Sequence, residues 1–344
     1  MSRLKVLFVF VGVVALLSGG CSEPGPEIIS PVYSGFTMGT TYSIKLASVL
    51  KNEVDPAQIK TGIDKVLEEV NRQMSTYIEN SEISRFNRAV AGEWFSVSPE
   101  TALVASKAVE VSDKSGGAFD VTVGPLVELW GFGRKKHDLI PEENDILEIK
   151  KIVGNGNLEF RSDPPALKKN IPQLYCDLSA IAKGHGVDRV AEYLDSLGAA
   201  NYMVEIGGEI RTKGKNAKGQ WWKIGISSPS PTGGLQKVIQ LKNTGMATSG
   251  DYRNYFEKDG VRYSHMIDPR TGRPITHTLA SVTILHPSCM EADAFATAIS
   301  VLGPEEGYKL AIKENLPAFF ISRKGEAFVE KMTPQFEALL HKSE

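Results

Sequence analysis

Asp293 and Thr297 are the residues whose types and spacing point most directly to metal chemistry. They lie four residues apart in the apolar stretch Glu291-Ala292-Asp293-Ala294-Phe295-Ala296-Thr297-Ala298. If this stretch is a helix, the carboxylate and the hydroxyl lie on one face, a turn apart. A hard cation such as Mg²⁺ takes such oxygens and usually keeps water as well. The simpler alternative is an exposed aspartate near a helix start, where it favours the helix dipole.

Two kinds of small-residue segment could also bring a ligand close to the main chain. The stretch Asp177-Leu178-Ser179-Ala180-Ile181-Ala182-Lys183-Gly184-His185-Gly186 is predicted to join a strand to a helix. A free carbonyl in such a bend can ligate a metal, although an ordinary turn with Asp177 as a local cap explains it equally well. Paired glycines precede Ala118-Phe119-Asp120 and Glu209-Ile210. Glycine beside an apolar strand often marks close approach of a ligand, but bulges and helix stops also use it.

His265 begins a turn that carries two arginines, His265-Met266-Ile267-Asp268-Pro269-Arg270-Thr271-Gly272-Arg273-Pro274. Together with the preceding Thr248-Ser249-Gly250-Asp251-Tyr252-Arg253, it could meet an anion with imidazole, hydroxyl and guanidinium groups. Most turns of this composition are only turns. The other histidines show no metal-binding spacing and are predicted to be surface or loop residues, at positions 137, 185, 277, 286 and 341.

Composition excludes several classes of partner and site. Lys and Arg number 39 against 41 Asp and Glu, a net charge of −2, so the chain has no basic excess for binding nucleic acid. The phosphate-binding and hydrolase motifs GxGxxG, GxxxxGK[ST], GxSxG and HExxH are absent. A phosphate compound would therefore have to be met by a metal, by basic side chains or by turn amides.

The cysteines are too few for a disulfide scaffold and have no zinc-binding spacing, since only Cys21, Cys176 and Cys289 are present. A disulfide between Cys176 and Cys289 and a pair of unpaired buried thiols are both compatible with the sequence.

The elements that must position these residues alternate between strand and helix periodicity. The pattern indicates α+β architecture with mostly antiparallel sheets and clustered helices. Helices are expected over residues 56–71, from a Ser98 cap to about 116, and over 186–197, 290–302 and 305–314. Strands are expected over residues 41–46, 173–178, 202–206, 222–226, 237–241, 279–285, 318–321 and 327–330.

The N-terminus has the pattern of an export signal. Arg3 and Lys5 precede twelve mostly apolar residues, Val6 to Leu17, and then Ser18-Gly19-Gly20-Cys21. Twelve helical residues cover about 18 Å, less than the roughly 30 Å hydrocarbon core, so a cleaved signal is favoured over a spanning helix. Cys21 resembles the acylated cysteine of a bacterial lipoprotein. We therefore expect a signal peptide at 1–20, a lipidated tether at 21–35 and a single catalytic domain at 36–344.

Taken together, these segments resemble the ApbE-type flavin transferases, FAD:protein FMN transferases of the bacterial periplasm. The likeness extends from about Phe36 to the C-terminus, and several motifs in one order carry it: Phe36-Thr37-Met38-Gly39-Thr40-Thr41-Tyr42, Phe119-Asp120-Val121-Thr122-Val123-Gly124-Pro125, Asp177-Leu178-Ser179 with Lys183-Gly184, Gly207-Gly208-Glu209, Thr248-Ser249-Gly250-Asp251-Tyr252, His265-Met266-Ile267-Asp268-Pro269 with Thr271-Gly272, and Glu291-Ala292-Asp293.

The resemblance implies both a site and an arrangement around it. It implies a T-fold-like domain whose active site lies in a cleft between two α/β lobes. FAD would be contacted by Met38, Tyr77, Ala118, Phe119, Asp120, Asp177, Lys183 and Ile267. Mg²⁺ would be held by the Ala180 carbonyl, Asp293 and Thr297. At Ala296 some relatives carry an acidic residue, so a second metal position is in doubt here.

The implied reaction transfers FMN from FAD to a threonine hydroxyl of an acceptor protein and releases AMP, with Mg²⁺ stabilising the phosphate charge. His265 is the candidate base. Acceptors would be flavin-carrying subunits of membrane redox complexes, of the sodium-pumping quinone reductase or Rnf type, and the enzyme would be lipid-anchored, facing the periplasm. Two alternatives remain: an Mg²⁺-dependent FAD pyrophosphatase that uses water, and a flavin-binding lipoprotein without turnover.

Overall fold

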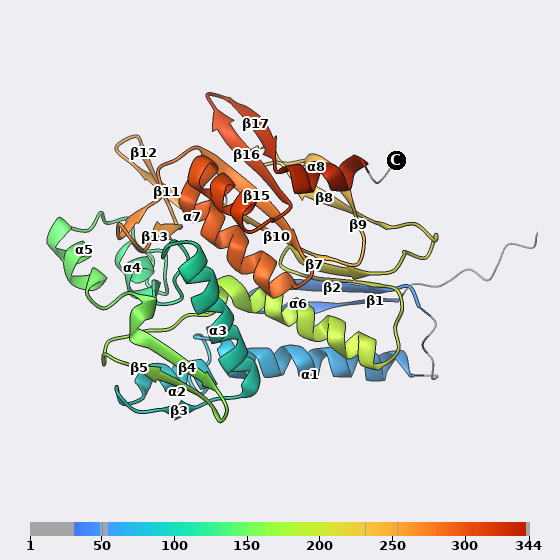
Figure 1. Ribbon diagram of the computed structural model, residues 1–344, viewed down its shortest axis with the longest axis horizontal. Coiled ribbons are helices and arrows are strands. Elements are labelled where there is room, and N and C mark those ends of the chain that lie inside the picture. Colours follow the sequence, from blue (N-terminus) through green and yellow to red (C-terminus); the bar gives the residue numbers. More distant parts are fainter. Residues whose placement is uncertain (1–30, 49, 51–53, 231, 253, 342–344) are drawn as a thin grey trace, which may run out of the picture.

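An eight-stranded antiparallel sheet is the central layer of the protein (Figure 1). The computed structural model describes residues 31–48, 50, 54–230, 232–252 and 254–341. In sheet order the strands are β1 (Val32–Thr37), β2 (Thr40–Leu46), β6 (Tyr202–Ile206), β7 (Glu209–Lys213), β10 (Gly245–Gly250), β15 (Leu279–His286), β16 (Ala318–Lys324) and β17 (Ala327–Met332). Sequence neighbours therefore pair as hairpins at both edges, and longer connections join strands in the middle.

One face of this sheet is covered by packed helices, α1 (Pro56–Met74), α3 (Pro99–Lys114), α6 (Ser179–Ser196) and α7 (Cys289–Lys313). Ser98 caps α3 through its side chain, as the sequence indicates, and Ser288 caps α7. Within α7, Gly303 has non-helical angles (φ 81°, ψ −173°) directly before Pro304. The expected break between two helical segments is therefore present as a kink.

The other face is covered by the hairpin of β8 (Trp222–Ser227) and β9 (Leu235–Leu241) and by α8 (Pro334–His341). Alternate residues of β16 enter the two cores: Phe320 packs with the helices, whereas Phe319 and Ile321 pack with Trp222 and Phe336. This is the period-two pattern of a strand that is buried on both sides.

Smaller elements flank the sheet at the end where α7 is kinked. A three-stranded sheet of β3 (Phe95–Ser96), β5 (Pro165–Lys169) and β4 (Leu158–Ser162) packs near α2 (Glu82–Arg88) and α3. Two further hairpins and two short helices complete the described chain: β11 (Tyr255–Lys258) with β12 (Val261–Ser264), β13 (Ile267–Asp268) with β14 (Arg273–Pro274), α4 (Gly124–Leu129) and α5 (Glu143–Lys150).

The predicted fold class is confirmed, but three local predictions are wrong. Residues 173–178 form no strand; they are irregular chain before α6. The helix expected from Gly186 begins at Ser179, two turns earlier, and its Gly184 lies against α7 rather than in a loop. The predicted tether ends sooner than residue 35, since Val32–Gly35 already pair with β2.

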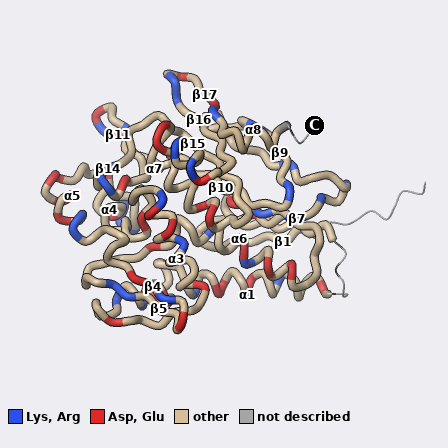
Figure 2. Tube along the Cα trace, in the orientation of Figure 1, with Lys and Arg blue, Asp and Glu red and all other residues tan. Residues whose placement is uncertain are grey.

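The two cysteines within the described residues, Cys176 and Cys289, are buried and unpaired, so of the two alternatives the free thiols are found. Lys and Arg alternate with Asp and Glu along the trace, in keeping with the near-neutral composition (Figure 2). None of the helices in the described part is both long and apolar enough to span a bilayer. The predicted signal and Cys21 lie outside the described residues.

Candidate functional site

A pocket of about 570 Å³ opens where the β1–β2 turn, the C-terminal end of α1 and the start of α6 meet. Four of the predicted flavin contacts line it together: Met38, Tyr77, Asp177 and Lys183. Tyr77 is 79% exposed, and the Arg134 guanidinium lies 5.4 Å from its ring centroid. The pocket therefore offers an aromatic face at one side and an ammonium group at the other, a combination suited to a flat aromatic ligand that carries phosphate.

The β1–β2 turn fixes the position of Met38. Met38 and Gly39 both have positive φ (49° and 72°), as a two-residue hairpin turn of the primed type requires. Asn71 of α1 donates a hydrogen bond to Thr37 Oγ1 at 2.9 Å, which ties the turn to that helix. A Cβ at Gly186 would lie 2.8 Å from the Met38 methyl group, so α6 presents a glycine to this side chain. The thioether consequently lies between the turn and α6.

Close packing of α6 on α7 brings the predicted metal ligands to one place. A Cβ at Gly184 would lie 2.3 Å from the Cys289 carbonyl oxygen, so only glycine permits this approach. The Gly184 N–H donates to Asp293 Oδ2 at 3.0 Å. Ala180 lies in the first turn of α6, and Thr297 follows Asp293 by one turn on α7. Asp293 is only 5% exposed, so the alternative of an exposed aspartate is wrong.

Lys183 lies between two buried carboxylates. Its ammonium is 2.7 Å from Glu209 Oε1 and 3.8 Å from Asp293 Oδ1. Burial raises the pKa of Glu209, and the nearby Asp293 charge raises it further, against the effect of Lys183. Burial acts to lower the pKa of Lys183, but the charges of Asp293 and Glu209 outweigh it and raise that pKa overall. Lys183 is therefore charged at neutral pH.

The donor set around Asp293 fits a hard divalent cation. Glu209 and Asp293 share the single positive charge of Lys183 in a buried place, and the raised pKa of both carboxyl groups shows that a second negative charge there lacks compensation. Within the described residues, no cluster of three or more His, Cys, Asp or Glu side chains could hold a metal, so a cation here would also need oxygens of other groups. One carboxylate, a carbonyl and a hydroxyl would leave room for water, as Mg²⁺ requires.

His265 is held by the chain between β12 and β13. Its Nδ1 lies 2.9 Å from the Asn254 carbonyl oxygen, which can only accept, so Nδ1 carries the proton and Nε2 keeps a lone pair. Burial lowers the pKa of His265, against the raising effects of the Asn254 carbonyl and the Asp251 charge. The Phe132 ring packs edge-on against it at 6.4 Å, and Arg134 beyond donates to the Thr76 carbonyl at the pocket. The ring thus has the tautomer and neutral charge of a base.

Comparisons with known proteins identify the family of this chain. The ApbE family model matches residues 38–320. The chain belongs to the ApbE family. It is 47% identical over 329 residues to the FAD:protein FMN transferase of Vibrio cholerae, covering 95% of this chain and 97% of that one. It is 42% identical to the Haemophilus influenzae protein of the same name, covering 99% of both chains.

Solved ApbE structures share the fold over nearly their whole length. The flavin transferase ApbE from Vibrio cholerae superposes with a TM-score of 0.84 at 46% identity, covering 90% of this chain and 99% of that one. The apo form of the Pseudomonas stutzeri flavinyl transferase ApbE gives 0.82 at 37% identity, covering 90% and 96%. The mostly antiparallel α+β architecture is therefore that of the ApbE family, while a cleft between two lobes stays a prediction.

Other predicted flavin contacts of this ApbE chain lie outside the Lys183 pocket. The side chains of Ala118, Phe119 and Ile267 are in the core, so they can offer a ligand only their main chain. Asp120 lines a separate hollow of about 390 Å³, and its carboxylate accepts bonds from Thr122 and the Asn155 N–H. The two regions are joined by the Asp177 N–H, which donates to the Val121 carbonyl at 2.7 Å.

Asp177 also has the local role that the simpler interpretation gives it. Its Oδ1 accepts the Ser179 N–H at 2.9 Å, next to the first turn of α6. Among the described residues, no hydrogen bond of this kind is made by its other carboxylate oxygen, Oδ2. A local cap and a pocket-lining role are therefore compatible in the same side chain.

Two residues that contact pocket residues of this ApbE chain were given no role from sequence: Glu209, which pairs with Lys183, and Arg134, which lies over the Tyr77 ring. Glu209 follows a glycine pair between two isoleucines, at Ile206-Gly207-Gly208-Glu209-Ile210. A charged residue between apolar strand positions was the available signal, because a buried carboxylate needs a partner. Arg134 belongs to an exposed Arg-Lys-Lys run with no such signal.

Proposed function

We propose that this ApbE-family enzyme transfers the FMN moiety of FAD to a threonine hydroxyl of an acceptor protein and releases AMP in an Mg²⁺-dependent reaction. The observation that carries the proposal is the proximity of pocket-lining Lys183 to the buried Asp293, 3.8 Å apart, with Thr297 one turn further along α7. The names of the relatives support the flavin transfer itself. The proposal adds to this the metal ion, the threonine acceptor and AMP as the leaving group.

In this reaction the threonine oxygen forms a bond to the FMN phosphorus while the bond from that phosphorus to the AMP oxygen breaks. The proton of the threonine hydroxyl goes to Nε2 of His265, which keeps its lone pair because Nδ1 donates to Asn254. Lys183 provides positive charge at the pocket wall for the pyrophosphate. Mg²⁺, held by Asp293, Thr297 and the Ala180 carbonyl, would supply Lewis-acid stabilisation of the phosphate charge.

Incubation of the protein with FAD, Mg²⁺ and a threonine-bearing acceptor tests the proposal. We expect a fluorescent acceptor band, AMP in equal amount, and a mass increase of the acceptor by one FMN phosphoester. Free FMN without a labelled acceptor would identify a pyrophosphatase. Tight FAD binding without AMP release would identify a flavin-binding protein.

The same incubation with an Asp293→Ala variant tests the metal assignment. Transfer should collapse while the unfolding temperature stays within a few degrees of the parent. Normal transfer by Asp293→Ala would remove Asp293 from the reaction. An acceptor whose threonine is replaced by alanine is the matched control for the site of attachment.

We also propose that Cys21 carries a lipid that anchors the enzyme to a bacterial membrane, facing the periplasm. The apolar stretch before Cys21 and the acceptors expected for such an enzyme, flavin-carrying subunits of sodium-pumping or Rnf-type redox complexes, support this. A Cys21→Ser variant should move from the membrane to the soluble fraction. Mass spectrometry of the parent should find the chain beginning at an acylated Cys21, and an unmodified residue there would contradict the anchor.

A further inference from the structure

Lys183 is shared unequally between its two carboxylate neighbours. It is 2.7 Å from Glu209 Oε1 but 3.8 Å from Asp293 Oδ1, so the direct ion pair is with Glu209. Among the described residues, these are the ion pairs found for Lys183. Asp293 keeps the Gly184 N–H on Oδ2, and Oδ1 has only the distant ammonium. The lysine thus leaves the proposed metal ligand incompletely paired.

The position of Glu209 is fixed by the strand it begins. Gly207 and Gly208 both have positive φ, and Glu205 Oε1 accepts the Gly208 N–H at 2.8 Å, which closes the β6–β7 turn. Residues 209 and 211 lie on the same face of β7, opposite Ile210, which packs with the β8–β9 core. Glu209 and Arg211 therefore both face the helices.

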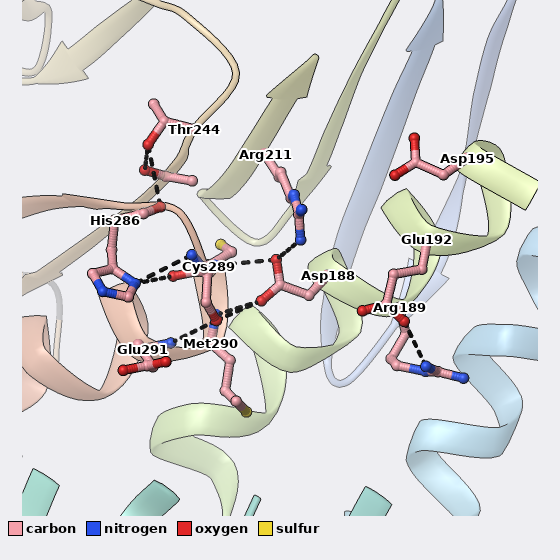
Figure 3. Close-up of polar contacts among 12 residues, drawn as sticks. Asp188, Arg189, Glu192, Asp195, Arg211, Thr244, His286, Cys289, Met290 and Glu291 are labelled. Atoms are coloured by element: carbon pink, nitrogen blue, oxygen red, sulfur yellow. Dashed lines mark hydrogen bonds and ion pairs between the residues drawn. The ribbon is translucent and has the colours of Figure 1, made fainter. Parts of the chain in front are cut away.

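Arg211 locks β7 against α6 and α7 (Figure 3). It donates to Asp188 of α6 at 2.7 Å. The same Asp188 carboxylate accepts the Ser288 hydroxyl and the Cys289 and Met290 N–H groups at the start of α7. Strand and both helices thus share one buried junction near the Lys183 cluster. The packing of β7 against α6 and α7 therefore fixes the main chain of Glu209 at a position from which its side chain contacts Lys183.

The second oxygen of Glu209 shows what the residue contributes. Oε2 is buried and has no hydrogen-bond partner within the described part of the chain. An unpaired carboxylate oxygen in the interior is costly, and a neutral residue would avoid the cost. A neutral residue could not pair with the Lys183 ammonium. We therefore take the negative charge of Glu209 to be its contribution at this position.

We propose that Glu209 is a positioning residue that holds the Lys183 ammonium away from Asp293, so that Asp293 is free to bind the divalent cation. The inference rests on the proposed metal site. Without the Glu209 charge, the ammonium would turn to its other neighbour, 3.8 Å away, and form an internal ion pair with Asp293. That ion pair would compete with the cation for the same carboxylate.

The test measures divalent-cation binding in the absence of FAD, by calorimetry with Mg²⁺ and by electron paramagnetic resonance with Mn²⁺. Glu209→Gln keeps the shape and removes the charge, and it should weaken binding by about tenfold or more, a change of about 1.4 kcal/mol. Lys183→Met removes the competitor, so cation binding should hold or tighten. Glu205→Gln is the matched control, since it alters a carboxylate at the same turn that has no ion pair with Lys183; its cation affinity should be unchanged.

A double-mutant cycle separates the proposed route from a direct effect of charge. In the Lys183→Met background, Glu209→Gln should change cation affinity little, because the lysine through which it acts is gone. An undiminished loss in that background would make Glu209 a direct ligand or a source of long-range charge and would overturn the proposal. So would a fall in affinity on Lys183→Met alone, a test that remains if Glu209→Gln does not fold.

Failure of the metal site itself gives a different result. If the parent protein binds neither Mg²⁺ nor Mn²⁺, the proposed metal site is wrong and the inference falls with it. If the parent binds a cation and the cycle shows no coupling between residues 183 and 209, only the positioning role is wrong.

Discussion

At the scale of single residues, the tautomer of His265 is set by one main-chain oxygen, that of Asn254. Because the Asn254 carbonyl accepts from Nδ1, the ring presents Nε2 as its free basic atom. Phe132 packs against the ring and belongs to an aromatic stack that continues through Phe256 and Tyr263 to Trp130. The proposed base is thus held in one tautomer by the main chain and in one place by aromatic packing.

Replacement of His265 by alanine should lower the rate of flavin transfer by about 10²- to 10⁴-fold, the range of a lost general base. Equilibrium FAD affinity should change much less, because binding does not need the proton acceptor. Stopped-flow or gel-fluorescence rates and FAD titration measure the two effects. His137→Ala, in the loop after α4, is the control. Equal loss of FAD affinity and rate would make His265 a binding residue instead.

The acid limb of the pH–rate profile should also report His265. The base must be neutral, and burial lowers its pKa below the usual 6.5. Transfer should therefore be nearly constant above pH 6.5 and fall only at lower pH, as the ring takes a proton. In His265→Ala this limb should disappear from kcat/KM. A limb retained unchanged in the variant would assign the titration to another group.

The type of a residue was often enough to make it a candidate for the site, but the sequence did not show which residue it contacts. Helical spacing singled out Asp293 and Thr297 as candidates, and the family resemblance singled out Lys183. Glu209 could not be assigned, because its role depends on Lys183, which lies 26 positions earlier in the chain. Contacts between distant segments leave no periodic signal in either segment.

At the scale of elements, the site depends on how closely α6 approaches α7. Gly184 permits contact with the main chain of Cys289, and the Gly184 N–H reaches Asp293 across the same contact. Residues 179–185 were expected to be a loop because glycine and small residues usually interrupt helices. They are helical because the neighbouring helix fills the space that side chains would have taken. A sequence pattern of one segment does not contain that information.

Gly184→Ala should force α6 and α7 apart, since a Cβ would lie 2.3 Å from a main-chain oxygen. We expect a loss of about 1–3 kcal/mol in the free energy of unfolding, typical of overpacking, with weaker Mn²⁺ binding. Gly186→Ala is the matched control on the same helix, because its Cβ would meet side-chain ends rather than main chain: the flexible Met38 methyl group at 2.8 Å and Ile206 Cδ1 at 3.5 Å. Equal destabilisation by both variants would show that helix packing at Gly184 has no special importance.

At the scale of the whole molecule, a central sheet with helices on one face and a hairpin on the other buries some polar side chains. His185 of α6 is one of them, although a surface or loop position was expected. It is 3% exposed, and among the described residues its Nε2 has no hydrogen-bond partner. Burial lowers the pKa of His185 to about 4, and the charge of Arg189 lowers it further, against Asp188.

The stability of the protein should therefore fall in acid. Between pH 6.5 and about 4 the unfolded chain takes a proton on His185 that the folded protein does not, so the free energy of unfolding decreases as pH falls through this window. The loss reaches about 3 kcal/mol and levels off at lower pH. Urea unfolding at several pH values measures it. His185→Gln should show a smaller loss, and equal pH slopes for both proteins would contradict this origin.

The class and most elements of the fold were predictable from periodicity, whereas the order of strands was not. Residues 202–206 were predicted exactly, and β8, β9, β15, β16 and β17 within a few residues. Pairing of β2 with β6, and of β7 with β10, joins segments separated by long stretches of chain. The sheet edges at β1 and β17 follow from those pairings and leave no local trace.

The two buried thiols have a consequence for folding if the chain is exported to an oxidising compartment, as proposed above. Burial raises the pKa of both Cys176 and Cys289, so the folded protein holds little of the thiolate that reacts with disulfides. Cys289 reaches this protection only when α7 docks on β10, where its Sγ–H faces the Met246 carbonyl. Before that step both thiols are open to oxidation. In such a compartment, maturation would require α7 to dock before either thiol is oxidised.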